Sequence, residues 1–310
     1  MDLSLSPDQA AILDALDGLA KQNVPAAADC REFVLSVPEL DAALSEGGFL
    51  DVAYDPDLGA VTAALIVERL AHLPCAVEAA ASALVRPLLG ELPRPICLVD
   101  AARTTQPVRF LAPGATVILV DGDKVTSFTA TEADVTPVHE SLYAYPVAML
   151  TPGSDHADRA QLHNIPAAEV LTRWRIAAAA EMAGLLAAAV DATVTYVSER
   201  KQFGRPLGVF QAVRHRLAED GVRATGARWL ALKAAHSGDA GDAALALQYA
   251  QDSATQTVYD LHQFLGGMGM TLEHPLHLWT YRLKALLSEL GGRQAQAVAA
   301  ARAIWVEAAE

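Results

Sequence analysis

The sequence has little that points to disulfides, a metal centre or a membrane span. Its 310 residues include only three cysteines, Cys30, Cys75 and Cys97, which lie far apart and form no Cys-x-x-Cys pair. Such sparse cysteine is typical of a reducing compartment and argues against a disulfide framework and a zinc site. A membrane span needs about 18 uninterrupted apolar residues. The longest candidate, residues 176–190, is broken by Glu181, so we expect no span.

Basic side chains are also too few for a nucleic-acid-binding protein. The chain has 23 Lys and Arg against 37 Asp and Glu, which gives a net charge of −14. Nucleic-acid binding depends on a basic surface that displaces counterions from phosphates, so this class of partner is not expected. Residues 1–4 lack a basic region followed by an apolar core, so they do not resemble a secretion signal. We therefore expect a cytoplasmic protein.

What the sequence does contain suits a folded protein of more than one domain. Hydrophobic residues make up 52% of the chain, which is enough to bury a sizeable core. The length suggests about two domains. Alanine is concentrated after residue 176, and this favours closely packed helices over sheet.

The first 92 residues show the spacing of amphipathic helices. Ser6, Pro7 and Gln9 predict a helix start with an N-cap, a proline at the first position and a capping-box glutamine. Apolar side chains then follow at helical intervals. Further helices are predicted over residues 38–46, 59–73 and 75–89.

Residues 93–164 change to short β-branched runs that are typical of strands. Three runs, at residues 96–99, 108–111 and 116–120, predict strands, and Asp121-Gly122-Asp123 predicts a hairpin turn. We expect a small β unit of about four to six strands.

From about residue 165 onward the pattern becomes that of long helices. Met182, Leu185, Leu186 and Ala189 follow the i, i+3, i+4 spacing of one helix face, and three more helices are expected before the C-terminus. We expect Asp242 to cap the third of these helices and Pro275 to open the fourth. Four such helices with short connections describe a bundle. The predicted order is therefore an N-terminal helical domain (1–92), a β domain (93–164) and a helical bundle (165–310).

One segment between the first two bundle helices concentrates positive charge. Arg200, Lys201 and Arg205 lie within six residues, beside Phe203. Arg200 could bind a phosphate while Phe203 offers a flat apolar face. The alternative is that these cations only complement the dipole of a helix C-terminus.

A second segment, residues 263–270, is rich in glycine. Gly266, Gly267 and Gly269 would let backbone amides approach a ligand closely. The alternative is an ordinary glycine cap at a helix end.

Together the two segments resemble the C-terminal domain of the acyl-CoA dehydrogenase family. The resemblance is strong over residues 165–292 and moderate before residue 95. It is carried by Arg200-Lys201-Gln202-Phe203-Gly204-Arg205-Pro206-Leu207, Phe210-Gln211, Gln263 with Gly266-Gly267-Met268-Gly269, and Glu273-His274-Pro275. It implies a mainly α fold with an N-terminal helical domain, a middle β domain and a C-terminal four-helix bundle. It also implies subunits that pack as dimers and as dimers of dimers, with FAD between subunits.

The resemblance implies specific FAD contacts in this chain. The implied contacts are Arg200 on the pyrophosphate with Gln202 and Phe203 beside it, Gln211 near the adenine, and Gln263 with the Gly266-Gly267 backbone at the adenosine and pyrophosphate of the adjoining site. Arginine and free backbone amides are suited to neutralise a diphosphate.

The sequence departs from the family at the catalytic base. In the family a carboxylate removes the α-proton of the thioester, and it stands at one of two positions. Here those positions carry Leu290 and Trp174, so no catalytic residue is assigned. Glu289 lies one position earlier, where the helix geometry would turn its carboxylate by about 100°. We expect Glu289 to be a solvated surface residue and Glu181 to face solvent.

A second departure is the shortened β zone. The family carries a Thr-Glu-Pro…Gly-Ser-Asp-like segment and a tryptophan-containing strand that embrace the flavin ring. Here residues 99–108 run directly from one predicted strand to the next, with neither element present. We therefore expect that this chain does not build its own pocket for the flavin ring.

No metal site is expected. His274 and His277 are three residues apart and could share a helix face, but no third ligand accompanies them.

These observations lead to the hypothesis of a degenerate subunit in an α2β2 heterotetramer. A full-length acyl-CoA dehydrogenase subunit would bring the flavin ring pocket and the catalytic glutamate, and this chain would bring the ADP-binding half-site, with one FAD per αβ pair. The chain resembles the short partners in paired acyl-CoA dehydrogenases of bacterial steroid degradation, which suggests a steroid-derived acyl-CoA. Electron transfer flavoprotein is the family's usual electron acceptor.

Two alternatives stay open. The chain could be a non-catalytic structural subunit without cofactor contact. It could also be a homomeric acyl-CoA dehydrogenase in which Glu289 is a shifted base.

Overall fold

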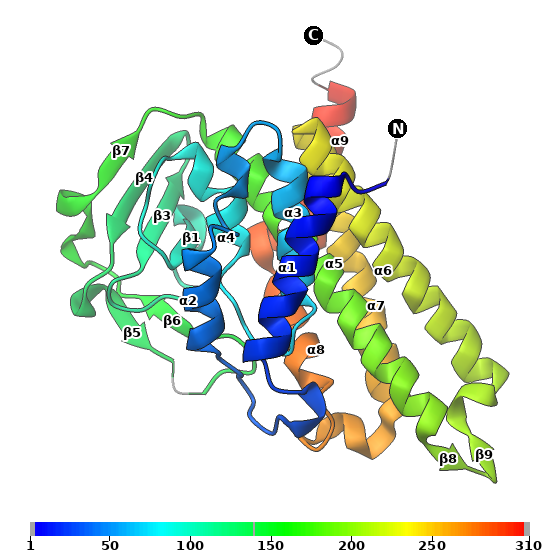
Figure 1. The fold of residues 1–310 in the computed structure, drawn as a ribbon. Coiled ribbons are helices and arrows are strands. Elements are labelled where there is room, and N and C mark those ends of the chain that lie inside the picture. The colour runs from blue at the N-terminus through cyan, green and yellow to red at the C-terminus, as the bar shows by residue number, and fades with distance from the viewer. Residues whose placement is uncertain (1–3, 139, 307–310) are drawn as a thin grey trace.

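The computed structural model describes residues 4–138 and 140–306 of the chain. The order along the chain is helices, then strands, then a second and larger set of helices, and Figure 1 shows these as neighbouring parts. The strands between residues 96 and 163 lie at one side of the molecule and the bundle at the other, with the N-terminal helices between them in this view. The predicted α–β–α order is confirmed.

The N-terminal part begins with the capping box that the sequence predicts. Gln9 donates its backbone N–H to Ser6 Oγ (3.1 Å), and Ser6 donates its own to Gln9 Oε1 (3.0 Å). This satisfies two amides that a helix start leaves free. The α-helices of this part are α1 (Pro7–Asn23), α2 (Pro38–Glu46), α3 (Gly59–Ala71) and α4 (Ala80–Leu84).

The helix predicted over residues 75–89 is wrong at its start. Helix α4 begins only at Ala80. Before it, Ala76 donates its backbone N–H to the distant carbonyl of Leu35 (2.8 Å) and not to a carbonyl one helical turn earlier. The Glu78 carboxylate then accepts the N–H of Ser82 (3.1 Å) near the start of α4. Local apolar spacing does not reveal such a distant backbone partner.

The β zone holds two small sheets. One has the order β1-β3-β4-β7, in which β1 and β3 are parallel, and the other has the order β2-β6-β5. The strands are β1 (Ile96–Asp100), β2 (Val108–Arg109), β3 (Thr116–Asp121), β4 (Lys124–Thr129), β5 (Val135–Pro137), β6 (Val147–Leu150) and β7 (Gln161–His163).

The β3–β4 hairpin is confirmed. Asp121 pairs with Lys124, and Gly122 adopts the positive φ (56°) that the turn requires. The described residues of this zone form seven strands rather than four to six, because strands of two or three residues are too short to show a periodic signal. The strand predicted at 108–111 ends at Arg109, since Phe110 has a positive φ of 61°.

The bundle is built around one long central helix. Its helices are α5 (Ala167–Glu199), α6 (Gln211–Ser237), α7 (Ala240–Leu265), α8 (His277–Leu286) and α9 (Gly292–Ala301), and a two-stranded hairpin, β8 (Lys201–Gln202) and β9 (Arg205–Pro206), joins α5 to α6 (Figure 1). The cap of α7 is Asp239, which accepts the N–H of Asp242, so the predicted cap at Asp242 is wrong. The fourth bundle helix, α8, has only 10 residues.

Short helical turns complete the chain. They are 3-10 turns at Ala27–Asp29, Val52–Tyr54, Arg86–Leu88, Ala101–Arg103, Glu132–Asp134, Asp155–Arg159, Leu207–Val209, Gly266–Met270 and Glu289–Gly291, and a π turn at Arg302–Val306.

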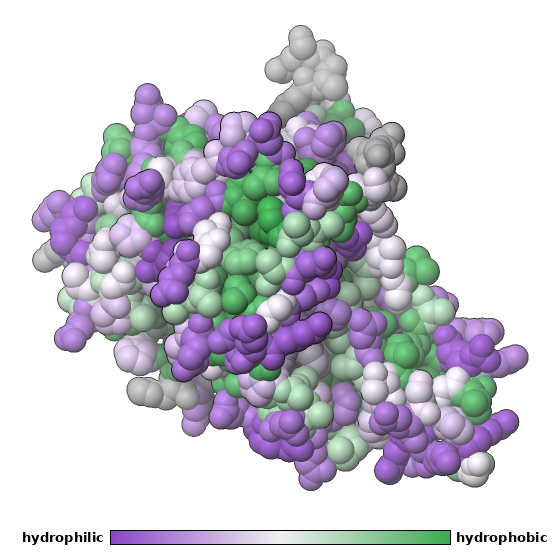
Figure 2. Space-filling view, in the orientation of Figure 1, coloured by the Kyte–Doolittle hydropathy of each residue, from purple (hydrophilic) through white to green (hydrophobic). Residues whose placement is uncertain are grey.

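Helix α5 is apolar because it lies in the core. By length and composition alone it could cross a membrane, but 83% of its most apolar 18-residue window is buried inside the protein. It packs against α3, α6, α7 and α8, as the central helix of a bundle does. On the face shown in Figure 2, apolar side chains gather between α1 and the β zone, within a mostly hydrophilic surround.

Candidate functional site

The β8–β9 hairpin presents Phe203 at its tip. Phe203 (φ 54°) and Gly204 (φ 78°) both lie in the left-handed region, as the two central residues of a tight hairpin do. This backbone is costly for a residue with a bulky side chain. The Phe203 side chain is nevertheless 87% exposed. Strain and exposure of an aromatic ring together indicate a residue placed to meet something outside this chain.

The segment around the Phe203 ring carries three cations, Arg200, Lys201 and Arg205. Arg200 is the C-cap of α5 and its carbonyl accepts the N–H of Leu207 (2.9 Å), which closes the base of the hairpin. The Arg205 guanidinium lies 4.4 Å from the centre of the Phe210 ring, and Phe203 meets the same ring edge-on. Among the residues that the structure describes, Arg200 forms no ion pair within 4.0 Å. The Arg200 charge is therefore available to a ligand.

The glycine-rich segment follows α7 at the same end of the bundle in Figure 1. Gly266 has a positive φ (57°) at the helix C-cap, so the conformation of this glycine is explained by the helix end. A Cβ added at Gly269 would lie 3.0 Å from the carbonyl oxygen of His262, so close internal packing explains why this position is a glycine. An added Cβ at Gly267 would meet nothing within 4 Å. Neither the helix end nor internal packing explains the glycine at position 267, and its backbone is exposed.

All the residues predicted to hold FAD are exposed in this chain. They are Arg200, Gln202, Phe203, Gln211, Gln263, Gly266 and Gly267. The structure brings the first four together around the hairpin and the start of α6, and the last three at the end of α7. Gln263 and Gly266 also line a groove of about 550 Å³ between α7 and α8. The FAD contacts of these residues stay predictions.

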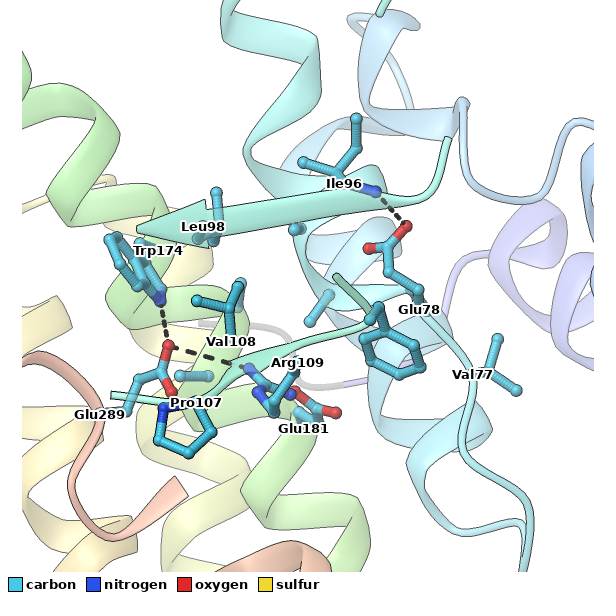
Figure 3. A pocket seen from close by; sticks show the side chains of 16 residues that line it. Val77, Glu78, Ile96, Leu98, Pro107, Val108, Arg109, Trp174, Glu181 and Glu289 are labelled. Carbon is cyan, nitrogen blue, oxygen red and sulfur yellow. Dashed lines mark hydrogen bonds and ion pairs between the residues drawn. The ribbon is translucent and has the colours of Figure 1, made fainter. Parts of the chain in front are cut away.

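A buried charge network lies where β2, α5 and the turn after α8 meet (Figure 3). Arg109 donates from Nη1 to Glu181 Oε2 (2.8 Å), and Tyr145 donates its hydroxyl to Glu181 Oε1 (2.6 Å). Trp174 donates its indole N–H to Glu289 Oε1 (2.6 Å), and this oxygen lies 3.9 Å from Arg109 Nη2. One guanidinium thus stands between two carboxylates.

Both carboxylates were placed wrongly by the sequence pattern. Glu181, expected to face solvent, is 5% exposed, and the Glu289 side chain, expected at the surface, is 16% exposed. A buried carboxylate needs a charged or hydrogen-bonding partner. Arg109 is that partner, 72 residues before Glu181. The sequence does hold a signal for this buried pair: Arg109 and Glu181 are each a single charged residue within an apolar run.

The charge states within the network follow from burial and proximity. Burial by itself lowers the pKa of Arg109. The Glu181 and Glu289 carboxylates raise this pKa by more than burial lowers it, so the pKa of Arg109 lies above its usual value. Burial, and then the Glu181 charge, raise the pKa of Tyr145 well above its usual value. At neutral pH, Arg109 is therefore a cation and the Tyr145 hydroxyl is a proton donor.

The turn that carries Glu289 is held in place from the bundle. Gln251 donates to the carbonyls of Leu286 (2.9 Å) and Glu289 (3.1 Å), and Gln296 donates to the carbonyl of Leu290 (2.6 Å). Leu290 adopts a left-handed conformation (φ 49°), and the two glycines after it also have a positive φ. The reversal turns the Leu290 side chain against the apolar core and leaves the Glu289 carboxylate facing Arg109.

Little space is left around the network. The pocket lined by Arg109, Trp174, Glu181 and Glu289 has a volume of about 60 Å³. Ligand pockets are typically about 300–1,000 Å³. The pocket as it stands can therefore hold water, but not a flavin ring or an acyl chain.

Within the part of the chain that the structure describes, no histidine cluster suggests a metal ion. His277 contacts two backbone carbonyls, those of His274 (3.0 Å) and Glu32 (2.9 Å). Over residues 4–138 and 140–306, no group of three or more His, Cys, Asp or Glu side chains is placed to share a metal.

His274 gives the fold a measurable pH dependence. Burial, with a smaller effect of His277, lowers the pKa of His274 to about 4, and its Nδ1 accepts the N–H of Leu276 (3.2 Å). The unfolded chain protonates at about pH 6.5, so stability falls as the pH drops from about 6.5 toward 4. We expect a loss of about 1 kcal/mol at pH 5.5 from this residue. Chemical denaturation of His274→Gln should show a smaller loss between pH 7.5 and 5.5, while exposed His215→Gln should match the wild type.

The chain is similar in sequence to acyl-CoA dehydrogenases. Residues 166–305 match the family model described as acyl-CoA dehydrogenase, C-terminal domain. The chain is 31% identical over 228 residues to acyl-CoA dehydrogenase IpdE2 of Mycobacterium tuberculosis, covering 69% of this chain and 71% of that protein.

Solved structures share the fold over nearly the whole chain. The ChsE4-ChsE5 complex from Mycobacterium tuberculosis contains a chain with a TM-score of 0.71 and 20% identity, covering 100% of this chain and 99% of that one. A Tcur3481-Tcur3483 steroid ACAD variant gives a TM-score of 0.70 and 20% identity, covering 97% and 100%. At this level of identity the likeness establishes the fold, and the predicted fold class is confirmed.

Proposed function

This chain belongs to the acyl-CoA dehydrogenase family, and from that premise we propose that it is a non-catalytic subunit that lends the ADP half of an FAD site to a catalytic partner. In this family the bound flavin accepts a hydride from the β-carbon of a CoA thioester. The residues of this chain would bind and orient the cofactor without taking part in that transfer.

The single observation that carries the proposal is the strained and exposed tip of the β8–β9 hairpin. Phe203 stays 87% exposed in a left-handed conformation, three residues after Arg200, which forms no ion pair with any residue that the structure describes. A diphosphate requires a cation and free backbone amides, and an adenosine requires an apolar face. Arg200 and Phe203 offer the cation and the apolar face, and the open Gly267 backbone at the end of α7 would serve the adjoining site, so the residues present fit the ADP half of FAD.

The chain's own pocket supports the non-catalytic part of the proposal. The two positions at which the family has its base carry Leu290 and Trp174, and Leu290 packs against the core. Glu289, the neighbouring carboxylate, already accepts a hydrogen bond from Trp174 and faces the Arg109 cation. A general base must be free to take a proton from substrate. The network leaves neither that freedom nor room for a substrate.

The partner would be a full-length acyl-CoA dehydrogenase subunit in an α2β2 assembly, with one FAD per αβ pair. The similar fold of a chain in the ChsE4-ChsE5 complex supports a heteromeric assembly, and the Tcur3481-Tcur3483 steroid ACAD supports a steroid-derived thioester. Electron transfer flavoprotein as acceptor and a cytoplasmic location belong to the same proposal.

Glu289→Gln tests whether this chain supplies the base. Glutamine keeps the acceptor for the Trp174 indole but cannot take a proton, so turnover of the assembled enzyme is expected to be unchanged. The measurement is steady-state acyl-CoA oxidation by the wild-type and variant complexes, with the partner's catalytic glutamate replaced as a positive control. A drop of roughly 10²–10⁴-fold, the contribution of a general base, would instead support a homomeric enzyme that uses Glu289.

A further inference from the structure

The buried network has the composition of a guanidinium-binding site. Arg109 comes from β2, whereas Glu181 comes from α5, Tyr145 from the segment before β6, and Glu289 from the turn after α8. The groups that surround the guanidinium therefore belong to elements other than its own strand. They would remain in place without the Arg109 side chain.

Each face of the guanidinium has a suitable neighbour. One nitrogen donates to Glu181 (2.8 Å), the other lies 3.9 Å from Glu289, and the group is 5.0 Å from the centre of the Tyr145 ring. Carboxylates that match the planar fork and an aromatic face that attracts the cation are what guanidinium groups bind in proteins.

The two carboxylates are also held independently of Arg109. Glu181 accepts the Tyr145 hydroxyl. Glu289 accepts the Trp174 indole N–H, as Figure 3 shows. Each carboxylate therefore has one neutral donor, and Arg109 is the cation that lies within ion-pair distance of both. The buried Arg282 also lies near Glu181, but its guanidinium donates to backbone carbonyls, those of Leu278 and Cys75 among them. Burying two carboxylates without a cation is costly. Once the Arg109 side chain is removed, the site should therefore bind another cation of the same kind.

The Arg109 side chain also fills space. The cavity of about 60 Å³ that it lines adjoins a second cavity of about 50 Å³, and Pro107, Val108, Trp174 and Glu289 line both. Truncation of Arg109 would enlarge this space beside Glu181 and Glu289. The side chain thus closes the junction between the β zone and the bundle.

We propose that Glu181, Glu289 and Tyr145 form a binding site for a guanidinium cation, and that the chain's own Arg109 is its permanent ligand and keeps this pocket closed. The inference concerns the chain's own pocket and does not depend on the FAD half-site at the far hairpin. Loss of the Arg200 contact would be seen in the dissociation constant for FAD, whereas loss of the Arg109 contact would be seen in the melting temperature of the chain.

The test is chemical rescue of Arg109→Ala in the full chain. The variant is expected to melt roughly 5–10 °C below the wild type, because a buried ion-pair partner is lost. Guanidinium chloride at about 20 mM should restore at least half of that loss in a dose-dependent way, by binding the folded state. Sodium chloride at equal ionic strength should not, because it supplies only screening.

A matched control removes an arginine from an exposed pair. Arg293 binds Asp252 (2.7 Å) with both side chains about half exposed, so Arg293→Ala should change the melting temperature little and should not respond to guanidinium. An unchanged melting temperature for Arg109→Ala would overturn the proposal. Equal recovery with sodium chloride, or an equal guanidinium response in Arg293→Ala, would also overturn it.

A second measurement covers the case in which Arg109→Ala does not fold. Arg109→Met keeps much of the side-chain volume and removes the charge. Glu181→Gln should lower the melting temperature markedly in the wild-type chain and much less in the Arg109→Met chain, because the carboxylate has then already lost its cation. Equal effects of Glu181→Gln in both backgrounds would show that Arg109 is not bound by this site.

Discussion

Replacement of Arg200 by alanine is expected to weaken FAD binding by the assembled enzyme about 10–100-fold, the loss of one charge-assisted contact of about 1.5–3 kcal/mol. Arg200 is exposed at the end of α5 and forms no ion pair within the described residues. The substitution should therefore leave the stability of this chain unchanged. Fluorescence titration of the deflavinated complex with FAD measures the dissociation constant directly.

Arg293→Ala serves as the control for a general loss of positive charge, because Arg293 lies on α9 in an exposed ion pair. Its FAD dissociation constant should match that of the wild type. If Arg200→Ala also binds FAD as the wild type does, the chain is a structural subunit without cofactor contact. A melting temperature that falls together with FAD affinity would mean that Arg200 acts through the fold.

Gly184→Ala is expected to lower the free energy of unfolding by about 3 kcal/mol or more, at the upper end of the cost of overpacking. Gly184 lies in α5 where α3 crosses it, and an added Cβ would lie 2.1 Å from the carbonyl oxygen of Glu68 and 2.9 Å from the Cβ of Ala71. The first of these contacts is with backbone, so the methyl group can be accommodated only if the two helices move apart. Urea denaturation of the two proteins measures the difference.

Gly221→Ala is the matched control on α6. An added Cβ at Gly221 meets nothing within 4 Å, so alanine should stabilise the protein by about 0.5–1 kcal/mol through its higher helix propensity. The two substitutions are the same chemical change within helices, and they are expected to have opposite signs. If Gly184→Ala is as stable as Gly221→Ala, α3 and α5 do not approach as closely as described.

The features that sequence predicts well are local. Ser6 and Gln9 form the predicted capping box, and Asp121-Gly122 forms the predicted turn, because each depends on residues within a few positions. The long helices of the bundle follow from apolar spacing in the same way. The charge of the hairpin that carries Phe203 and its family resemblance are also visible in the sequence.

The features that sequence misses depend on distant partners or on backbone reversals. The burial of Glu181 depends on Arg109, which is far away in the chain. The direction of Glu289 depends on the left-handed conformation of Leu290, which an alignment without gaps does not reveal. Opposite charges within two separate apolar runs indicate a buried pair, and that signal can be sought in other sequences.

We propose that this chain completes an FAD site without having an active site of its own. Flavin content measured by absorbance on the chain purified alone, and on the chain purified with a full-length partner, tests it most directly. We expect no flavin on the isolated chain and one FAD per pair of unlike subunits in the complex. Stoichiometric FAD together with acyl-CoA oxidation by the isolated chain would contradict it.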